Sequence, residues 1–378
     1  MIVYTIIVLL LTVGYVLLFI FYLTGWFLLP EYVRRADTAT TKVSVVIAAR
    51  NEALNIGALL QDITLQTYPS HLTEIMVVDD FSTDDTAAIV SSFSKRNVKL
   101  LRLQDQIRED QFHGSFKKKA LEAGITATSG ELIITTDADC RMGKDWLATL
   151  ADFYEKEQCH MVVAPVSFTN EVSVFEKLQS LDFLGMIGIT AATLQFNFPV
   201  MCNGANLAFR RRSFEAVNGY DGINEVTSGD DVLLMQKIAL RWKSSIHFLK
   251  NRDAMVTTFA MPELESFIQQ RIRWTSKSKH YVDWRINANL LWVYLFNLSI
   301  VFTTLLCFFN STYFFLLAFQ LALKMIVEIA FLSGVTAFFN RRKLMRLFLP
   351  AQLFHIIYLV VIGTMGNSMK FKWKGRRQ

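Results

Sequence analysis

The strongest constraint on the fold is a long uncharged segment at the start of the chain. Residues 1–30 contain no Asp, Glu, Lys or Arg, and the run from Val3 to Leu29 is apolar. A helix needs about 20 apolar residues to cross the hydrocarbon core of a bilayer. The composition becomes apolar again from about Asn287 to Asn367. These shifts predict a transmembrane helix at 1–30, a globular domain with interfacial helices at 31–285, a transmembrane region at 286–367 and a basic tail at 368–378.

The first apolar segment is expected to be a retained anchor, because it lacks the basic start and the small-residue cleavage site of a signal peptide. Arg34, Arg35 and Lys42 follow it, and basic residues favour the cytoplasmic side of a membrane. The four cysteines show neither paired spacing nor a zinc pattern, as expected of reduced cytosolic thiols. We therefore expect a multi-pass protein of the cytoplasmic (plasma) membrane whose globular domain faces the cytoplasm.

The carboxyl-terminal apolar region divides into about three spans. Lys324 and Glu328 lie one helical turn apart in the second span and are expected to pair inside the helix bundle. Arg341 to Lys343 would face the cytoplasm, but the basic tail would then fall outside. The last segment is therefore either a span or a re-entrant or interfacial helix. The expected spans are about 286–309, 312–339 and 347–367.

Between the apolar regions, predicted strands alternate with predicted helices. Val43–Ala49 is a continuous apolar run, which is typical of a strand buried on both faces. Further strands are expected at 74–78, 98–103, 131–136 and 160–166, and helices at 53–66, 84–94, 117–128 and 145–154. This alternation predicts an α/β fold with a mostly parallel sheet. Residues 172–198 predict an apolar helix, either in the membrane interface or in the core.

Acidic residues follow three of the predicted strands. They are Glu52, the pair Asp79 and Asp80, and the pair Asp137 and Asp139. In open parallel sheets ligands bind at the carboxyl ends of the strands, and converging carboxylates repel one another unless a cation or polar ligand joins them. Carboxylate oxygens suit Mg²⁺ or Mn²⁺. Asp137 and Asp139 are therefore candidate metal ligands, with helix capping as the alternative.

The segment after Asp79 and Asp80 has two interpretations. Ser82 and Asp85 have the spacing of a capping box for the next helix. That box leaves the two preceding aspartates unexplained, and they could accept hydrogen bonds from a nucleobase or ribose.

Lys117, Lys118 and Lys119 open a predicted helix, where basic side chains are mildly unfavourable. They form either a solvated face or, in part, a diphosphate-binding site. Asp230 and Asp231 precede another apolar helical run. They are either a helix cap or a general base, since a neighbouring carboxylate can raise the pKa of a buried one.

Gln270, Arg273 and Trp274 share one face of a predicted helix. Arginine presents a fork of donors to a phosphate, and an indole ring presents a flat face to a sugar. A helix meeting the membrane surface is the alternative.

Together these motifs resemble the membrane-integral family 2 glycosyltransferases with a GT-A fold. That group includes the cellulose, hyaluronan and poly-N-acetylglucosamine synthases and ceramide glucosyltransferase. The resemblance covers about residues 43–285 and rests on an Asp, a DxD, a further Asp and QxxRW in this order. One departure is that Thr275 follows the tryptophan, where the family often continues with Arg-Gly.

The resemblance implies a role for each motif residue and a cytoplasmic GT-A (Rossmann-like) domain flanked by transmembrane helices. Asp231 would be the catalytic base beside Asp230, and Asp139 with Asp137 would hold Mg²⁺ or Mn²⁺. Donor-binding residues would be Glu52, Asp79, Asp80, Lys117, Asp137 and Arg273, and acceptor-binding residues would be Trp274, Gln270, Asn203 and Gly204.

The implied reaction is inverting transfer of a hexose or N-acetylhexosamine from a UDP-sugar to a growing polysaccharide or a membrane lipid. Transfer of a single sugar to a lipid is the alternative to processive synthesis. A non-catalytic membrane subunit of an export complex is the alternative from another class. The modest net charge of +6 lies partly beside apolar segments and does not predict nucleic-acid binding. A partner subunit or homo-oligomer is left open.

Overall fold

The computed structural model describes residues 2–34, 40–365, 372–373 and 376–377. Arg35 and most of the predicted basic tail lie outside these residues. The chain forms two compact units. One comprises residues 30–170 and 197–259 with the short strands β11 (Lys372–Trp373) and β12 (Arg376–Arg377), and the other comprises residues 1–29, 171–196 and 260–371. We call them the sheet unit and the helical unit. The predicted domain boundaries at residues 30 and 285 stay a prediction.

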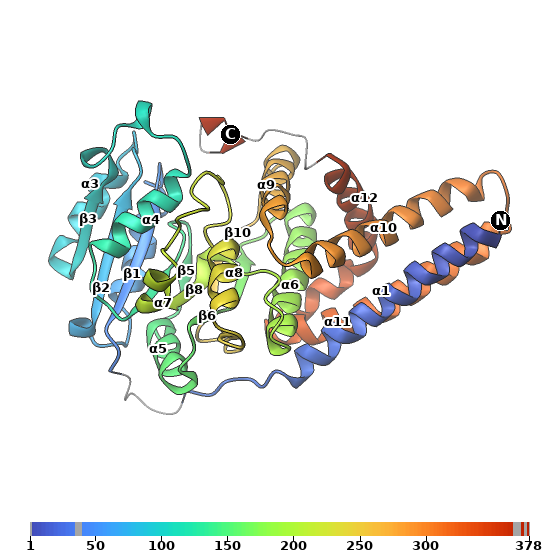
Figure 1. Ribbon diagram of the computed structural model, residues 1–378, viewed down its shortest axis with the longest axis horizontal. Coiled ribbons are helices and arrows are strands. Elements are labelled where there is room, and N and C mark those ends of the chain that lie inside the picture. The colour runs from blue at the N-terminus through green and yellow to red at the C-terminus, as the bar shows by residue number, and fades with distance from the viewer. Residues whose placement is uncertain (1, 35–39, 366–371, 374–375, 378) are drawn as a thin grey trace. The chain divides into compact units, whose positions relative to one another are not determined.

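The sheet unit is built on a seven-stranded sheet with the strand order β3-β2-β1-β4-β8-β6-β9 (Figure 1). A second sheet has three strands in the order β5-β10-β7. The strands of the large sheet are β1 (Val43–Ala49), β2 (Thr73–Asp79), β3 (Val98–Arg102), β4 (Leu132–Thr135), β6 (Met161–Val163), β8 (Leu207–Arg210) and β9 (Ile246–Phe248). Those of the small sheet are β5 (Arg141–Met142), β7 (Val166–Thr169) and β10 (Val256–Phe259).

Most neighbouring strands of the large sheet are parallel, as predicted. The pairs β1–β2, β1–β4, β2–β3 and β6–β9 are parallel, whereas β8 is antiparallel to both β4 and β6. The predicted strand at 160–166 is wrong in one respect. It divides into β6 and β7 around Pro165, whose ring removes a backbone donor.

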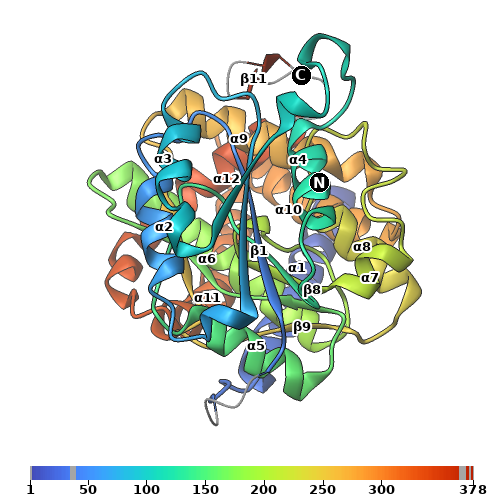
Figure 2. The ribbon, with the colours of Figure 1, turned by 90° about the vertical axis from the view of Figure 1, so that its left-hand side faces the viewer.

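Helices cover both faces of the parallel strands. Figure 2 shows α2 and α3 on one side of β1 and α4 on the other. The helices of this unit are α2 (Ile56–Thr64), α3 (Thr86–Ser92), α4 (Phe116–Thr126), α5 (Trp146–Glu157), α7 (Arg211–Ala216) and α8 (Val232–Arg241). Their order along the chain matches the predicted alternation through residue 157.

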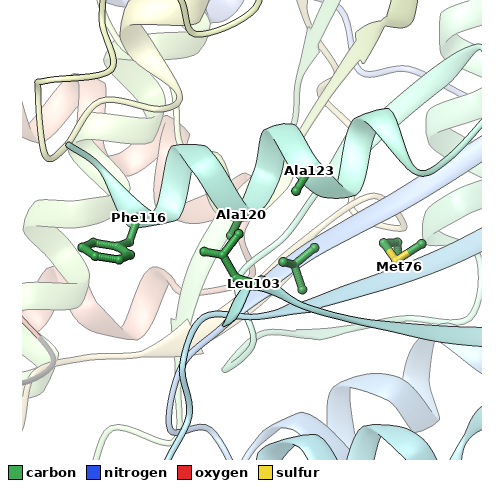
Figure 3. Packing of buried hydrophobic residues seen from close by; sticks show 6 residues of the cluster. Met76, Leu103, Phe116, Ala120 and Ala123 are labelled. Carbon is green, nitrogen blue, oxygen red and sulfur yellow. The ribbon is translucent and has the colours of Figure 1, made fainter. Parts of the chain in front are cut away.

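The packing of α4 on the sheet follows from two sequence periods. Phe116, Ala120 and Ala123 recur at helical spacing, and Met76 and Val78 alternate along β2 (Figure 3). All five are buried in one cluster. Gly124 of α4 lies so close to the sheet that an added Cβ would come within 2.5 Å of Val46 Cγ1. Together with the cluster contacts of Phe116, Ala120 and Ala123, this close approach holds α4 against the sheet along its length.

The predicted capping box at Ser82 and Asp85 is wrong. Asp85 makes no capping hydrogen bond with its side chain. Asp84 instead accepts hydrogen bonds from Thr86 N at 3.0 Å and from Ala53 N at 3.0 Å, and Ser82 Oγ accepts one from Asn51 N at 3.0 Å. These side chains join the loops that follow β1 and β2, which spacing within one loop does not reveal.

Among the described residues, the helical unit contains four helices long and apolar enough to cross a membrane. They are Ile2–Leu28, Trp284–Cys307, Tyr313–Phe338 and residues 342–364. Helices α1, α10 and α11 run alongside one another (Figure 1). The helices of this unit are α1 (Ile2–Leu28), α6 (Val174–Gln195), α9 (Leu264–Ser276), α10 (Trp284–Cys307), α11 (Tyr313–Phe338) and α12 (Phe348–Met365).

The predicted pair of charges in α11 is confirmed. Lys324 Nζ contacts Glu328 Oε1, and both side chains are buried. Tyr15 of α1 donates to Glu328, and Gln352 of α12 bonds both charged groups. Every charge therefore has polar partners, as a low-dielectric interior requires.

Candidate active site

The sheet topology brings the predicted acidic motifs to one edge. β1, β2 and β4 are parallel, with Ala49 paired to Asp79 and Val46 paired to Thr135, so the residues after these strands lie at the same edge. β8 runs antiparallel to β4, and its first residue, Leu207, pairs with Thr135. The segment just before β8 therefore reaches the carboxyl end of β4. This antiparallel pairing explains why Gly204, which precedes a strand, lies beside residues that follow other strands.

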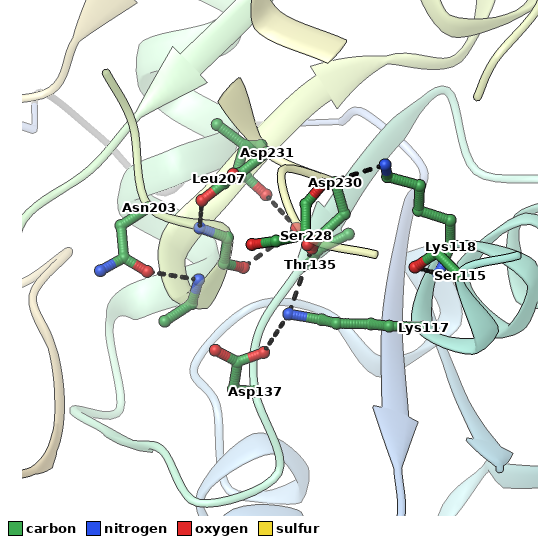
Figure 4. Close-up of polar contacts among 12 residues, drawn as sticks. Ser115, Lys117, Lys118, Thr135, Asp137, Asn203, Leu207, Ser228, Asp230 and Asp231 are labelled. Carbon is green, nitrogen blue, oxygen red and sulfur yellow. Dashed lines mark hydrogen bonds and ion pairs between the residues drawn. The ribbon is translucent and has the colours of Figure 1, made fainter. Parts of the chain in front are cut away.

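Lys117 lies at the centre of the cluster (Figure 4). Its Nζ atom lies 2.8 Å from Asp137 Oδ1 and 3.1 Å from Asp230 Oδ2. Burial alone would lower the pKa of Lys117, but the carboxylates of Asp137 and Asp230 outweigh burial and raise this pKa above its ordinary value. The ammonium group is therefore a fixed positive charge between two motifs that are distant in the sequence.

Asp231 is held in one orientation by backbone amides. Its Oδ1 accepts a hydrogen bond from Val232 N at 2.6 Å, and its Oδ2 accepts one from Gly204 N at 3.2 Å. An added Cβ on Gly204 would lie 3.2 Å from Asp230 Oδ2 and 3.5 Å from Asp231 Cβ. Asn203 Oδ1 in turn accepts from Ala205 N at 2.9 Å and shapes this turn. Asp231 therefore caps α8, as one interpretation predicted.

Asp139 is oriented by a different strand. Thr258 Oγ1 of β10 donates to Asp139 Oδ2 at 3.2 Å. Cys140 Sγ lies 3.8 Å from Asp139 Oδ1, and burial together with Asp137 and Asp139 raises the pKa of this thiol well above its ordinary value. The thiol is therefore neutral and donates to the carboxylate.

Within the described part of the chain, no group of three or more His, Cys, Asp or Glu side chains is arranged to hold a metal ion. Asp137 and Asp139 supply only oxygen donors, and Mg²⁺ commonly takes one or two carboxylates and fills its remaining positions with water and substrate phosphate. The cation beside Asp137 Oδ1 is Lys117 Nζ, which shows that this carboxylate accepts positive charge. The donor set thus fits a divalent ion that arrives with a diphosphate.

The aspartates at the end of β2 differ in their partners. Asp80 is 2% exposed and lies 4.0 Å from Arg50 Nη1, which also donates to Asp80 O at 2.9 Å. Asp79 is 3% exposed, and its Oδ1 has no hydrogen-bond partner among the described residues. A buried carboxylate oxygen without a partner is costly, so a ligand N–H or O–H would stabilise it. Glu52 Oε2 accepts from Asn55 Nδ2 at 2.9 Å.

Gln270, Arg273 and Trp274 lie on α9 in the helical unit, as their spacing predicted. The guanidinium carbon of Arg271 lies 4.5 Å from the centre of the Trp274 ring, and Arg271 is paired with Asp182 of α6 at 2.8 Å. Gln270 Oε1 is buried and has no hydrogen-bond partner among the residues described. Their predicted participation in sugar transfer stays a prediction.

Three residues of the site, Thr258, Thr135 and Ser115, were not predicted to act there, and the contacts of a fourth, Lys118, were not predicted. Thr258 orients Asp139, and Thr135 Oγ1 donates to Gly204 O at 3.2 Å. Ser115 and Lys118 bind the loop before Asp230. Lys118 was assigned with its neighbours to a solvated face or a diphosphate site, but it is 2% exposed. The only sequence signal was a third lysine in one helical turn, which does not tell which of the three is buried.

Two family models match this chain. The model described as Glycosyl transferase family 2 matches residues 44–217, and the model described as Glycosyl transferase family group 2 matches residues 132–327. The second match covers Asp137, Asp139, Asp230, Asp231 and the Gln270–Trp274 motif.

Curated relatives include enzymes of lipid and polysaccharide synthesis. A beta-monoglucosyldiacylglycerol synthase from Nostoc sp. is 28% identical over 271 residues, which cover 67% of this chain and 53% of that protein. A poly-beta-1,6-N-acetyl-D-glucosamine synthase from Staphylococcus epidermidis is 24% identical over 237 residues, which cover 61% of this chain and 53% of that protein. The chain thus spans about half the length of these relatives.

A solved structure agrees with the fold over nearly its full length. The mannosyltransferase PcManGT from Pyrobaculum calidifontis, in complex with GDP-Man and Mn²⁺, has a TM-score of 0.56 and 18% sequence identity. The similarity covers 96% of this chain and 98% of that one. This agreement concerns the fold, which is mixed α/β with a largely parallel central sheet.

Proposed function

Because the chain belongs to the family 2 glycosyltransferases, we propose that it is an inverting enzyme which moves a hexose or N-acetylhexosamine from a UDP-sugar to a hydroxyl group of a membrane lipid. One observation carries the proposal. Lys117 forms ion pairs with both Asp137 and Asp230. Asp230 and Asp231 also lie beside Gly204, so the residues of separate motifs form one cluster.

The donor binds at the carboxyl ends of β1, β2 and β4. The partnerless Oδ1 of Asp79 accepts a hydrogen bond from the nucleoside, with Asp80 and Glu52 beside it. Lys117 supplies positive charge to the diphosphate, and Asp137 contacts the sugar nucleotide. Arg273 adds a guanidinium fork for phosphate oxygens. The burial of Asp79 supports this assignment, because nothing else in the described structure meets its free oxygen.

Asp137 and Asp139 would hold Mg²⁺ or Mn²⁺ when the donor binds. The ion would supply positive charge that stabilises the departing diphosphate. Thr258 Oγ1 donates a hydrogen bond to Asp139 Oδ2, and the neutral thiol of Cys140 donates one to Asp139 Oδ1. This chain's own contribution is thus to fix two carboxylates before the ion arrives.

Asp231 removes the proton from the acceptor hydroxyl. The acceptor oxygen forms a bond to the anomeric carbon while the bond from that carbon to the diphosphate oxygen breaks, so the configuration inverts. The backbone amides of Val232 and Gly204 orient the carboxylate, and Asp230 holds Lys117 beside it. A base positioned this way contributes roughly 10²- to 10⁴-fold to the rate.

The acceptor is bound by Trp274, Gln270, Asn203 and Gly204. The relatives from Nostoc sp., Trichormus variabilis and Synechocystis sp., each named as a beta-monoglucosyldiacylglycerol synthase, favour a lipid as the acceptor. A growing polysaccharide is the second candidate, favoured by the QxxRW motif and by the Staphylococcus epidermidis relative.

A lipid acceptor is supported by the four helices among the described residues that are long and apolar enough to cross a membrane. We propose that the protein is a multi-pass protein of the cytoplasmic membrane and that its sheet unit faces the cytoplasm, where nucleotide sugars are made. The basic residues Arg34 and Lys42 support this orientation.

The test is a transfer assay with purified protein in lipid vesicles that contain diacylglycerol. Radiolabelled UDP-glucose, UDP-N-acetylglucosamine and GDP-mannose are each supplied with Mn²⁺, and the products are separated by size. A single labelled glycolipid from a UDP-sugar is expected, and a labelled polymer would identify the second candidate. Absence of transfer from every donor, with intact protein, would contradict the proposed function.

A further inference from the structure

The catalytic carboxylates end a long irregular loop. Residues 217–231 connect α7 to α8, and within them Gly222 and Gly229 have φ values of +77° and +82°. Such values suit glycine and allow sharp changes of chain direction. A misplacement of about 1 Å can lower a reaction rate by about 10²-fold, so a loop that carries a catalytic base needs support from a rigid element.

Lys118 of α4 supplies such support. Its Nζ atom donates hydrogen bonds to the carbonyl oxygens of Ile223 at 2.7 Å, Val226 at 2.6 Å and Ser228 at 3.1 Å. An ammonium group has three donors, and the loop carbonyls use all of them. Figure 4 shows the Lys118 ammonium near Ser228, two residues before Asp230.

The residue that caps α4 adds two more bonds to the same loop. Ser115 N donates to Asn224 O at 2.9 Å, and Ser115 Oγ donates to Thr227 O at 3.4 Å. The first turn of α4 thus binds the carbonyl groups of five of the six loop residues from 223 to 228. Because α4 is packed tightly on β1 and β2 through Gly124, this turn is a fixed support.

Packing alone is a poor explanation for a lysine at this position. Lys118 is 2% exposed, and a buried ammonium carries a large desolvation penalty. It also stands in the first turn of a helix, where a positive charge is unfavourable. An apolar side chain would fill the space without either penalty. The charge is explained by the hydrogen bonds that it makes to the loop.

We propose that Lys118 is a positioning residue that fixes residues 223–228 and thereby sets Asp230 and Asp231 against Lys117 and Gly204. Consecutive lysines of α4 have different tasks: Lys117 contacts the carboxylates, and Lys118 holds the chain that carries them. The inference rests on the proposed function, because it assumes that Asp231 is the base.

The experiment compares Lys118→Met with Lys237→Met. Lys237 Nζ also donates to two carbonyls of this loop, those of Gly219 and Asp221, both at 2.7 Å, but they lie at its distant end. Both variants lose hydrogen bonds from an ammonium group to carbonyl groups of this loop. Lys118→Met is expected to lower kcat by about 100-fold at unchanged donor Kd, whereas Lys237→Met lowers the unfolding temperature with little change in kcat. Equal kcat in folded Lys118→Met and wild-type protein contradicts the proposal.

Chemical rescue separates positioning from general stabilisation. Lys118→Ala removes three methylenes and the ammonium group, and propylammonium can replace them. Added propylammonium is expected to restore part of kcat, while propanol and the same concentration of NaCl are not. Loss of kcat that none of the three additions reverses contradicts the role of the charge.

Two further measurements keep the outcome decisive. If Lys118→Met does not accumulate, Lys118→Arg takes its place. Folded Lys118→Arg is expected to have a lower kcat at unchanged donor Kd, because a planar guanidinium group cannot donate to the three carbonyl oxygens with the geometry of an ammonium group. A wild-type kcat in Lys118→Arg contradicts the proposal. Amide hydrogen exchange of residues 223–231 is expected to quicken in Lys118→Met even without substrate. If exchange quickens in Lys118→Met but the wild-type protein transfers no sugar, the proposed function is wrong and the role of Lys118 in holding the loop stands. If exchange of residues 223–231 is unchanged in Lys118→Met, Lys118 does not hold the loop and the present proposal is wrong.

Discussion

The ammonium nitrogen of Lys117 lies 3.1 Å from Oδ2 of Asp230, although the two residues are separated by more than a hundred positions in the chain. Lys117 belongs to the first turn of α4, and Asp230 ends the loop before α8. The same ammonium reaches Asp137, which follows β4. One cation therefore lies between two carboxylates and offsets the repulsion that would otherwise separate them.

The lack of a side chain at Gly204 is expected to be necessary for this arrangement. In Gly204→Ala the new Cβ would lie 3.2 Å from Asp230 Oδ2, so the carboxylate must move by a few tenths of an ångström. We expect kcat to fall by about tenfold or more, with protein folding retained. Gly143→Ala is the matched control, since its Cβ would meet nothing within 4 Å. Steady-state kinetics of both variants measure the effect, and equal kcat values would contradict it.

The divalent ion is expected to depend on Thr258. Thr258→Val keeps the side-chain shape but removes the hydrogen bond to Asp139, so the Mn²⁺ concentration for half-maximal transfer should rise by about 10-fold. Thr257→Val on the same strand removes a bond to Arg141 O instead and should leave that concentration unchanged. A metal titration of EDTA-treated enzyme provides the measurement. Full activity in EDTA would refute the requirement for an ion.

The stability of the sheet unit is expected to depend on pH through Glu74, on β2 away from the site. Although burial opposes the shift, hydrogen bonds from Ser129, Ser44 and Lys42 lower the pKa of Glu74 to about 2. The bonds therefore stabilise the fold fully above the unfolded pKa, about 4.3, and the contribution is lost as the pH falls towards 2. Because solvent screens this partly exposed carboxylate, Glu74→Gln should lower the free energy of unfolding at pH 7 by only about 1 kcal/mol.

The check is a comparison of unfolding temperatures of wild-type and Glu74→Gln protein at pH 7 and near pH 3. The difference should shrink at the lower pH, while kcat at pH 7 stays the same. A constant difference across this range would show that the charge of Glu74 is not its cause.

Replacing both Lys324 and Glu328 of the buried pair in α11 is expected to destabilise the protein less than replacing Lys324 alone. Lys324→Met leaves Glu328 as an unpaired buried charge, which should destabilise the helical unit by about 3–5 kcal/mol. The double variant Lys324→Met with Glu328→Gln removes both charges and should recover much of that loss. Thermal unfolding in one detergent measures all the variants. Additive losses would show that the two side chains are not coupled.

Local sequence patterns were enough to predict the parallel half of the sheet. The apolar run Val43–Ala49 is β1 with the same bounds, because a strand buried on both faces needs no other signal. The strand β8 was not predicted, since Leu207–Arg210 is short and owes its place to antiparallel pairing with β4 and β6. Pairing between distant segments leaves no periodicity in either one.

The positions of the acidic residues were more predictable than the side chains that orient them. Residue type and place after a strand singled out Asp137 and Asp139, whose surroundings fit the expected oxygen-donor site. Lys118 and Thr258 were not identified, because their partners are loop carbonyls and a carboxylate about a hundred residues away. A hydrogen bond to a backbone carbonyl requires no particular residue type in the partner, so no motif records it.

The replacement of one carboxylate by its isosteric amide tests the central claim most directly. Asp231→Asn keeps the shape of the side chain but cannot take the acceptor's proton, and Asp221→Asn in the same loop is the exposed control. We predict that Asp231→Asn binds the nucleotide sugar with wild-type affinity by calorimetry, while its transfer rate falls by about 10³-fold or more. Transfer by Asp231→Asn at the wild-type rate would contradict the account.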